Sequence, residues 1–192
     1  MNKPKDFDMA GNNMLEAGVH LVEILNVKEV TSKNGNEMLK VSVDISDTDK
    51  QGGYFRRQYN NTVKSFPGAK WSNNATKYIM CFNRAGQTNY HFKKFVDYCA
   101  EGGRVAEWGD NFCKSLKGAV IPAIFIEEEY LKDGEIKTFV RLDNFISISK
   151  WEQLQKSNYK PEIKRLPEEY RPESDLEPVV DADADNDEDK LW

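Results

Sequence analysis

An Asn-Gly pair between two apolar segments is the strongest constraint on the fold of this chain. Asn34-Gly35 supplies the two residues that a tight antiparallel hairpin turn prefers. The segment before it, 18–30, is rich in β-branched side chains, and in 38–45 apolar and polar residues alternate. These features predict two paired strands. Neither parity of 18–30 is cleanly apolar, so we expect a β-bulge there.

The remaining pattern predicts one more strand, a helix and a second hairpin. Residues 54–59 (YFRRQY) are interpreted as the third strand, followed by a functional loop over 60–86. Apolar side chains recur at i, i+3, i+4 and i+7 in 88–100, which predicts a helix. Residues 116–130 and 136–148 predict the two strands of the second hairpin.

Pro122 and the turn Asp133-Gly134 refine that second hairpin. A proline cannot donate to a strand ladder, so the first of its strands is expected to lie at an edge or to carry a bulge. Three strands, a helix and a hairpin is the order of a mainly β, five-stranded Greek-key barrel of the oligonucleotide/oligosaccharide-binding (OB) type, with the helix between strands 3 and 4. Another small α+β barrel would have the same order.

Composition divides the 192-residue chain into four parts. Residues 1–17 lack periodicity and are expected to be a flexible N-terminal segment, and 18–150 form the barrel domain. Residues 151–172 are polar and proline-containing, which is typical of a linker. Residues 173–192 hold nine acids and one base, so this tail carries −8 and is expected to be disordered.

A stretch without acids points to the ligand. Residues 50–94 contain nine bases, nine aromatic residues and no acid. Cations pair with phosphates, and aromatic rings stack on unpaired bases, so the stretch indicates binding of single-stranded nucleic acid. The alternative interpretation is a solvated charged surface whose aromatic rings belong to the core. We expect phosphates or bases to contact residues of this stretch and one ring of the second hairpin: Tyr54, Arg56, Arg57, Lys64, Lys70, Trp71, Lys77, Tyr78, Arg84 and Phe139.

Other chemistry finds little support in the sequence. It has no phosphate-binding glycine loop, and its three cysteines and two histidines lack metal-ligand spacing, so we expect no enzyme activity, cofactor or metal. The odd cysteine count and the absence of a secretory signal favour reduced thiols in a cytoplasm. The longest uncharged apolar run has nine residues, too short to span a membrane. The acids Asp44, Asp47 and Asp49 leave a metal-dependent nuclease as an alternative.

Taken together, several motifs resemble the single-stranded DNA-binding proteins of bacteriophages and related mobile elements. They are GVHLVEI at 18–24, TSKNGNEML at 31–39, LKGAVIPA at 116–123, EEEY at 127–130 before its turn, and an acidic tail ending in Trp192. The resemblance implies an OB core that coats unpaired strands in DNA replication, recombination or repair. An RNA-binding OB module and an adaptor that meets an acidic protein remain alternatives.

The tail supplies the second half of this expectation. The resemblance implies that such tails bind polymerase, helicase, primase or recombinase partners. In the simplest tail of this kind the acids run directly into an aromatic terminus, whereas here Lys190 interrupts them. Its charge also lets it compete for the DNA groove. The residues expected to meet partners are Asp181, Asp183, Asp185, Asp187, Glu188, Asp189, Leu191 and Trp192. A homo-oligomer is compatible with these features.

Overall fold

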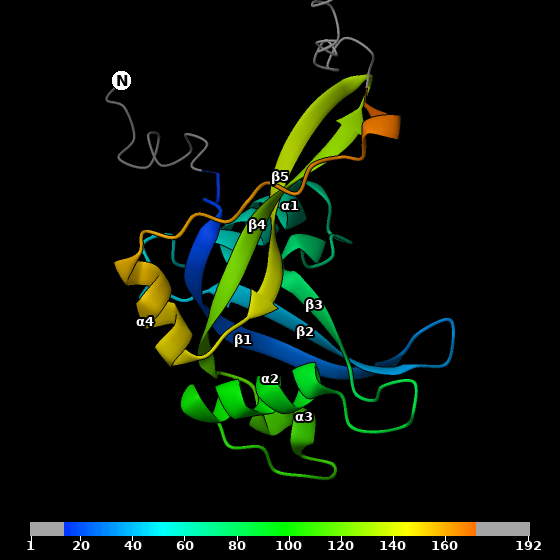
Figure 1. Ribbon diagram of the computed structural model, residues 1–192, viewed down its shortest axis with the longest axis vertical. Helices are drawn as coiled ribbons and strands as arrows, with labels where there is room; N and C mark the ends of the chain where they lie inside the picture. The colour runs from blue at the N-terminus through cyan, green and yellow to red at the C-terminus, as the bar shows by residue number, and fades with distance from the viewer. Residues whose placement is uncertain (1–13, 172–192) are drawn as a thin grey trace, which may run out of the picture.

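Five antiparallel strands form one strongly curved sheet in the computed structural model, which describes residues 14–171 (Figure 1). The strands follow the spatial order β3-β2-β1-β4-β5. The edge strands β3 and β5 approach each other, so the sheet is a nearly closed barrel, consistent with an OB-like fold. The strands are β1 (Gly18–Thr31), β2 (Glu37–Ile45), β3 (Thr76–Met80), β4 (Val120–Lys132) and β5 (Glu135–Phe145).

Helices lie in the connections between the strands and after the last strand. They are α1 (Tyr54–Ser65), α2 (Tyr90–Glu101), the short α3 (Phe112–Ser115) and α4 (Ile148–Lys156), with 3-10 turns η1 (Asn73–Ala75) and η2 (Glu168–Tyr170). Within residues 14–171, none of these helices is long and apolar enough to cross a membrane. Helix α2 lies between β3 and β4, as the sequence predicts.

The first hairpin matches its sequence signals closely. The turn holds Gly35 at a φ of 79°, and β1 and β2 pair in antiparallel register on either side of it. The register shifts between Ile24 and Asn26, which confirms the expected bulge in β1. Asn89 caps α2, because its side chain accepts a hydrogen bond from the backbone N–H of His91.

The prediction that 54–59 form the third strand is wrong, because these residues begin α1, and the third strand lies at 76–80 within the expected loop. Phe55 and Tyr59 lie four positions apart, a spacing that places two side chains on one face of a strand and also on one face of a helix. A long-range contact decides between them: Asp44 Oδ1 accepts hydrogen bonds from the backbone N–H of Phe55 at 2.9 Å and of Arg56 at 3.4 Å. A carboxylate there stabilises a helix N-terminus.

The two longer connecting helices close opposite ends of the barrel. Phe55 of α1 stacks on buried Phe125 of β4 with ring centroids 6.0 Å apart. At the other end, Phe95 of α2 lies 5.1 Å from Phe145 of β5. Apolar side chains from every strand fill the space between these rings, so both helices are part of the core.

Pro122 does not lie at an edge, since β4 pairs with both β1 and β5. The other half of that expectation is confirmed, because the pairing of β4 with β5 shifts register between Ile124 and Phe125. The irregularity lets the long β4–β5 hairpin bend away from the barrel, as Figure 1 shows.

Residues 151–171, expected to be a linker, pack against the barrel in part. They begin within α4, and Lys164 then forms a parallel bridge to Glu128 of β4. Glu128 also contacts the Lys164 ammonium at 2.8 Å, and Glu129 forms an ion pair with Arg171. These contacts hold the last described residue beside the β4–β5 hairpin. The predicted flexible segment falls outside the described residues over 1–13, and so does the whole acidic tail.

Candidate nucleic-acid interface

The outer surface of β1, β2 and β3 presents cations and a ring in register. Lys28 of β1 pairs with Lys40 of β2, and Lys40 pairs with Tyr78 of β3. Their side chains therefore form one row across three strands. Lys28 is exposed, half of the Tyr78 ring is exposed, and Lys40 Nζ lies 5.7 Å from its centroid. We call this set the cationic row.

Neutral residues flank the cationic row on both sides. The next row toward the hairpin turn is Val30, Met38 and Met80, and the row on the other side is Asn26, Ser42 and Thr76. None of the nine side chains is acidic, while the intervening positions of β2 point into the core. We call the three rows the outer face. A phosphate would therefore meet no negative side chain on the outer face.

A cleft continues this face where β3 and β5 approach without a ladder. Its volume is about 410 Å³, and we call it the seam cleft. Lys77 bridges it by donating from Nζ to the backbone oxygen of Asp143. Burial lowers the pKa of Lys77, which the charge of Asp143 partly counteracts. The other lining residues come from β3, α2 and β5: Tyr78, Ile79, Met80, Asn89, Tyr90, His91, Phe95, Tyr98, Asn144 and Phe145.

The ten residues predicted to bind DNA come from several different elements. Lys77 and Tyr78 lie together in the seam cleft. The other eight lie on α1 (Tyr54, Arg56, Arg57 and Lys64), before η1 (Lys70 and Trp71), after β3 (Arg84) and on β5 (Phe139). They belong to neither the outer face nor the lining of the seam cleft. The sequence stretch is therefore not one continuous groove.

Two arginines of this set are engaged within the protein. Arg56 Nε lies 3.4 Å from Asp44 Oδ2, and Arg56 Nη2 lies 3.6 Å from Glu23. Arg57 donates to the backbone oxygen of Gly52. Both side chains remain exposed, but each is engaged with groups around the start of α1. The acids that Arg56 meets lie outside the acid-free stretch, so charge counting within it could not reveal these pairs.

Several of the predicted stacking rings serve packing. Trp71 is half-buried against the core and lies 5.6 Å from the Tyr59 ring. Tyr54 also packs against the core and lies edge-on to Phe55 at 5.1 Å. On the β4–β5 hairpin, Phe139 contacts Tyr130 at 5.5 Å in a similar edge-on geometry. These rings offer a base less free surface than Tyr78 does.

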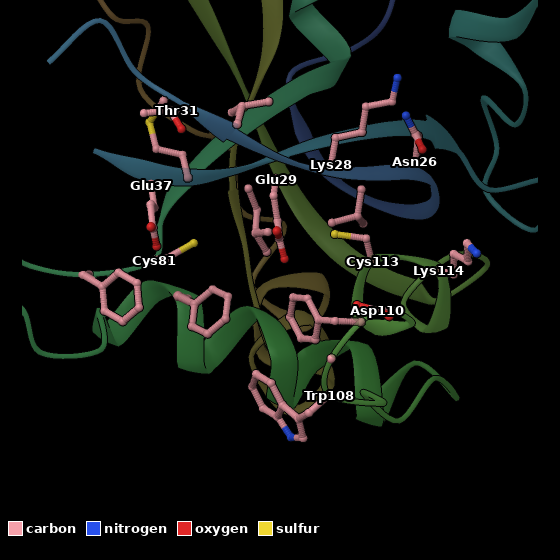
Figure 2. Close-up of a pocket in the computed structure, with 18 of the residues that line it drawn as sticks. Asn26, Lys28, Glu29, Thr31, Glu37, Cys81, Trp108, Asp110, Cys113 and Lys114 are labelled. Atoms are coloured by element: carbon pink, nitrogen blue, oxygen red, sulfur yellow. The ribbon is translucent and has the colours of Figure 1, made fainter. Parts of the chain in front are cut away.

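A larger hollow of about 1130 Å³ lies beneath the β1–β2 hairpin (Figure 2). Strand alternation sends the carboxylates of Glu29 and Glu37 into it, whereas Lys28 contributes to its lining but extends its side chain away from it. Trp108, which is 70% exposed, stacks on Phe112 at its lower side with ring centroids 4.9 Å apart. Three acids and three lysines line this hollow, so its charges offset one another, whereas the outer face carries positive charge alone. The hollow is therefore less suited to a nucleic-acid strand than the outer face.

The three cysteines do not form a reactive site. Cys81 and Cys113 line the hollow, and burial raises the pKa of each thiol, with nearby glutamates raising it further. Burial raises the pKa of Cys99 to about 12. The thiolate is the reactive form, so these cysteines are poor nucleophiles near neutral pH.

The acids suggested for a metal centre act separately. Asp44 is fully buried beneath the start of α1, whereas Asp47 is exposed. Asp49 Oδ1 lies 3.1 Å from His20 Nδ1, and Asp49 Oδ2 accepts from the backbone N–H of Leu21. Between residues 14 and 171, no group of three His, Cys, Asp or Glu side chains is arranged to hold a metal ion.

Asp49 yields a prediction about acid stability. Burial raises its pKa, but hydrogen bonds from His20 and from backbone N–H groups outweigh burial, so the net pKa is lowered. A lowered folded-state pKa stabilises the protein above about pH 4, where the unfolded carboxyl is also ionised, and this contribution is lost as pH falls through the folded-state pKa. Asp49→Ala should reduce the free energy of unfolding by about 1–3 kcal/mol at neutral pH.

Urea unfolding at a series of pH values checks this expectation. The gap between wild type and Asp49→Ala should narrow below about pH 4. Asp47→Ala is the matched control in the same loop, and it should change stability by less than about 0.5 kcal/mol. A gap that widens on acidification would contradict the role of Asp49.

Sequence reasoning missed four exposed or half-exposed residues near the outer face and the seam cleft. Lys28 and Lys40 lie outside the acid-free stretch, while Tyr90 and Lys94 lie inside it but were assigned to the helix. The alternation of β2 placed Lys40 on the outward side and was the available signal. The bulge in β1 changes which residues of the strand point outward after Ile24, so the alternation of the sequence does not show that Lys28 lies on the outer face.

Comparison with known proteins gives no relative. No protein-family model matches the sequence, and no curated protein matches it. The fold and the geometry of these surfaces therefore carry the functional argument.

Proposed function

We propose that this protein binds single-stranded DNA without strong sequence preference, and that it does so on the outer face. The observation that carries the proposal is the cationic row, in which two lysines and an exposed tyrosine share one register across β1, β2 and β3. Lysines neutralise phosphates, and a tyrosine ring stacks on any base because every base has a flat face. OB-type barrels bind oligonucleotides on this side of the barrel.

The surrounding rows support the same function. Met38 and Met80 give an apolar, adaptable surface beside Tyr78, which suits bases of different shape. Asn26 and Thr76, which are half-buried, supply side chains that can meet phosphate or base edges, whereas Ser42 between them is buried. Flat, polar and cationic groups lie together here without an acid, whereas the larger hollow combines lysines with carboxylates.

The resemblance to phage single-stranded DNA-binding proteins gives this activity a setting. Such a protein would coat unpaired strands during replication, recombination or repair and recruit partner proteins through its acidic tail. Arg171, the last described residue, is held beside the β4–β5 hairpin by its ion pair with Glu129. A tail of 20 residues can span at most about 70 Å, which covers the dimensions of a domain of this size.

Titration of labelled oligonucleotides tests the proposal and its alternatives together. We expect the full-length chain to bind an unpaired DNA 20-mer more tightly than the matched duplex, with affinity that falls as salt rises. Equal affinity for both forms would contradict the proposal. A clear preference for the matched RNA 20-mer would favour an RNA-binding module, and cleavage of the strand with magnesium or manganese would favour a nuclease.

A further inference from the structure

We infer that the seam cleft holds one unpaired base of the bound strand, stacked on Tyr90 with Tyr78 at the edge shared with the outer face. This inference deepens the proposed function and rests on it. It assigns base contact to a second element, the start of α2, in addition to the strands that carry the outer face. The ligand is thus a strand with at least one accessible, unstacked base.

The position of Tyr90 supports the inference. Its ring is 66% exposed, although it belongs to the first turn of a helix that buries Phe92 and Phe95. His91 lies edge-on to it at 5.7 Å, and Lys94 Nζ lies 5.8 Å from its centroid. An exposed ring is a typical stacking partner for a base, and Lys94, which also pairs with Asp97 at 3.6 Å, adds a nearby positive charge.

The backbone at the seam supplies the polar groups that a base edge needs. β3 and β5 pair with β2 and β4, and in the described part of the chain no ladder joins β3 to β5. The backbone donors and acceptors on their facing edges are thus left for other partners, apart from two on β5: Asp143 O accepts from Lys77, and the Phe145 N–H donates to Asn144 Oδ1 at 3.0 Å. Asn144 is exposed beside this edge. A base presents both donors and acceptors and can complete such contacts.

Continuity with the outer face gives the base a route into the cleft. Tyr78 belongs both to the cationic row and to the lining of the seam cleft. A strand whose phosphates follow Lys28 and Lys40 therefore reaches the mouth of the cleft at Tyr78. The volume of about 410 Å³ is within the range of small-ligand sites and exceeds the space that one flat base occupies.

Three variants and two probes test this inference. Fluorescence anisotropy is measured with an oligo-dT 20-mer and with a 20-mer of the same backbone in which every base is replaced by an abasic site. Tyr90→Ala should lower the dT affinity by roughly 5- to 150-fold, because it removes one stacking partner. Tyr90→Phe should stay within about twofold of wild type, and Tyr90→Ala should match wild type on the abasic strand.

Tyr170→Ala is the matched control, since Tyr170 is a similarly exposed tyrosine on η2. It should leave dT affinity unchanged. If wild type binds unpaired DNA and Tyr90→Ala binds dT as Tyr170→Ala does, the inference is overturned while the proposed function stands. If wild type shows no preference for unpaired DNA, both fail. Photo-crosslinking of wild type to 5-iodo-deoxyuridine DNA needs no variant, and an adduct at Tyr90 is expected. Adducts that spare Tyr90, including adducts at Tyr78 alone, overturn the inference.

Discussion

Lys28→Ala/Lys40→Ala is expected to bind single-stranded DNA roughly 60-fold more weakly than wild type at about 50 mM salt. The two lysines occupy adjacent positions of one cross-strand row, so each is expected to neutralise one phosphate. For single strands the salt slope is about −0.7 per phosphate, and loss of two contacts should flatten it by about 1.4. The two affinities should converge near 1 M salt, where counterion release no longer favours binding.

A double variant on the other side of the β1–β2 hairpin provides the control. Lys114 and Lys117 line the larger hollow and carry the same total charge. Lys114→Ala/Lys117→Ala should therefore change net charge equally but leave the salt slope close to that of wild type. Equal flattening in both variants would show that only overall charge matters, and the assignment of the outer face would be wrong.

The second large effect concerns the core. Phe125→Ala should lower the free energy of unfolding by about 3–5 kcal/mol, because it empties a fully buried site. The ring centroid of Phe125 lies 6.0 Å from that of Phe55 in α1 and 5.6 Å from that of His20 in β1. Removal of the Phe125 ring therefore loosens both the helix and the barrel end. Chemical denaturation followed by circular dichroism measures the loss.

Phe66→Ala is the matched control for this prediction. Phe66 follows α1 and is 67% exposed, so the same substitution should cost less than about 0.5 kcal/mol. A loss of similar size in the two variants would contradict the conclusion that α1 closes the barrel through Phe55 and Phe125.

Local patterns predicted much of the fold. Asn34-Gly35 marked the first hairpin, the 3.6-residue period marked α2, and alternation in β2 separated core from surface. Each of these features depends on residues close together in the chain. The barrel and its order followed because few topologies accommodate these elements in a short chain.

Long-range contacts explain what the sequence could not show. Helix α1 depends on Asp44, which lies ten residues before its start, and Asp44 has no sequence feature that distinguishes a helix cap from a turn acid. Arg56 was counted as a free cation, yet its partners are Asp44 and Glu23 on two different strands. The sequence predicts that Trp71 stacks on a base, but the ring packs against the core, and its burial depends on contacts that the local sequence does not show.

Lysine footprinting tests the central claim most directly, namely that an unpaired strand lies on the outer face. The full-length chain is labelled with an amine-reactive reagent with and without an excess of oligo-dT, and labelling at each lysine is read by mass spectrometry. We predict that DNA protects Lys28 and Lys40 and leaves Lys114 and Lys117 as reactive as in the free protein. Protection of Lys114 and Lys117 with no change at Lys28 and Lys40 would contradict the account.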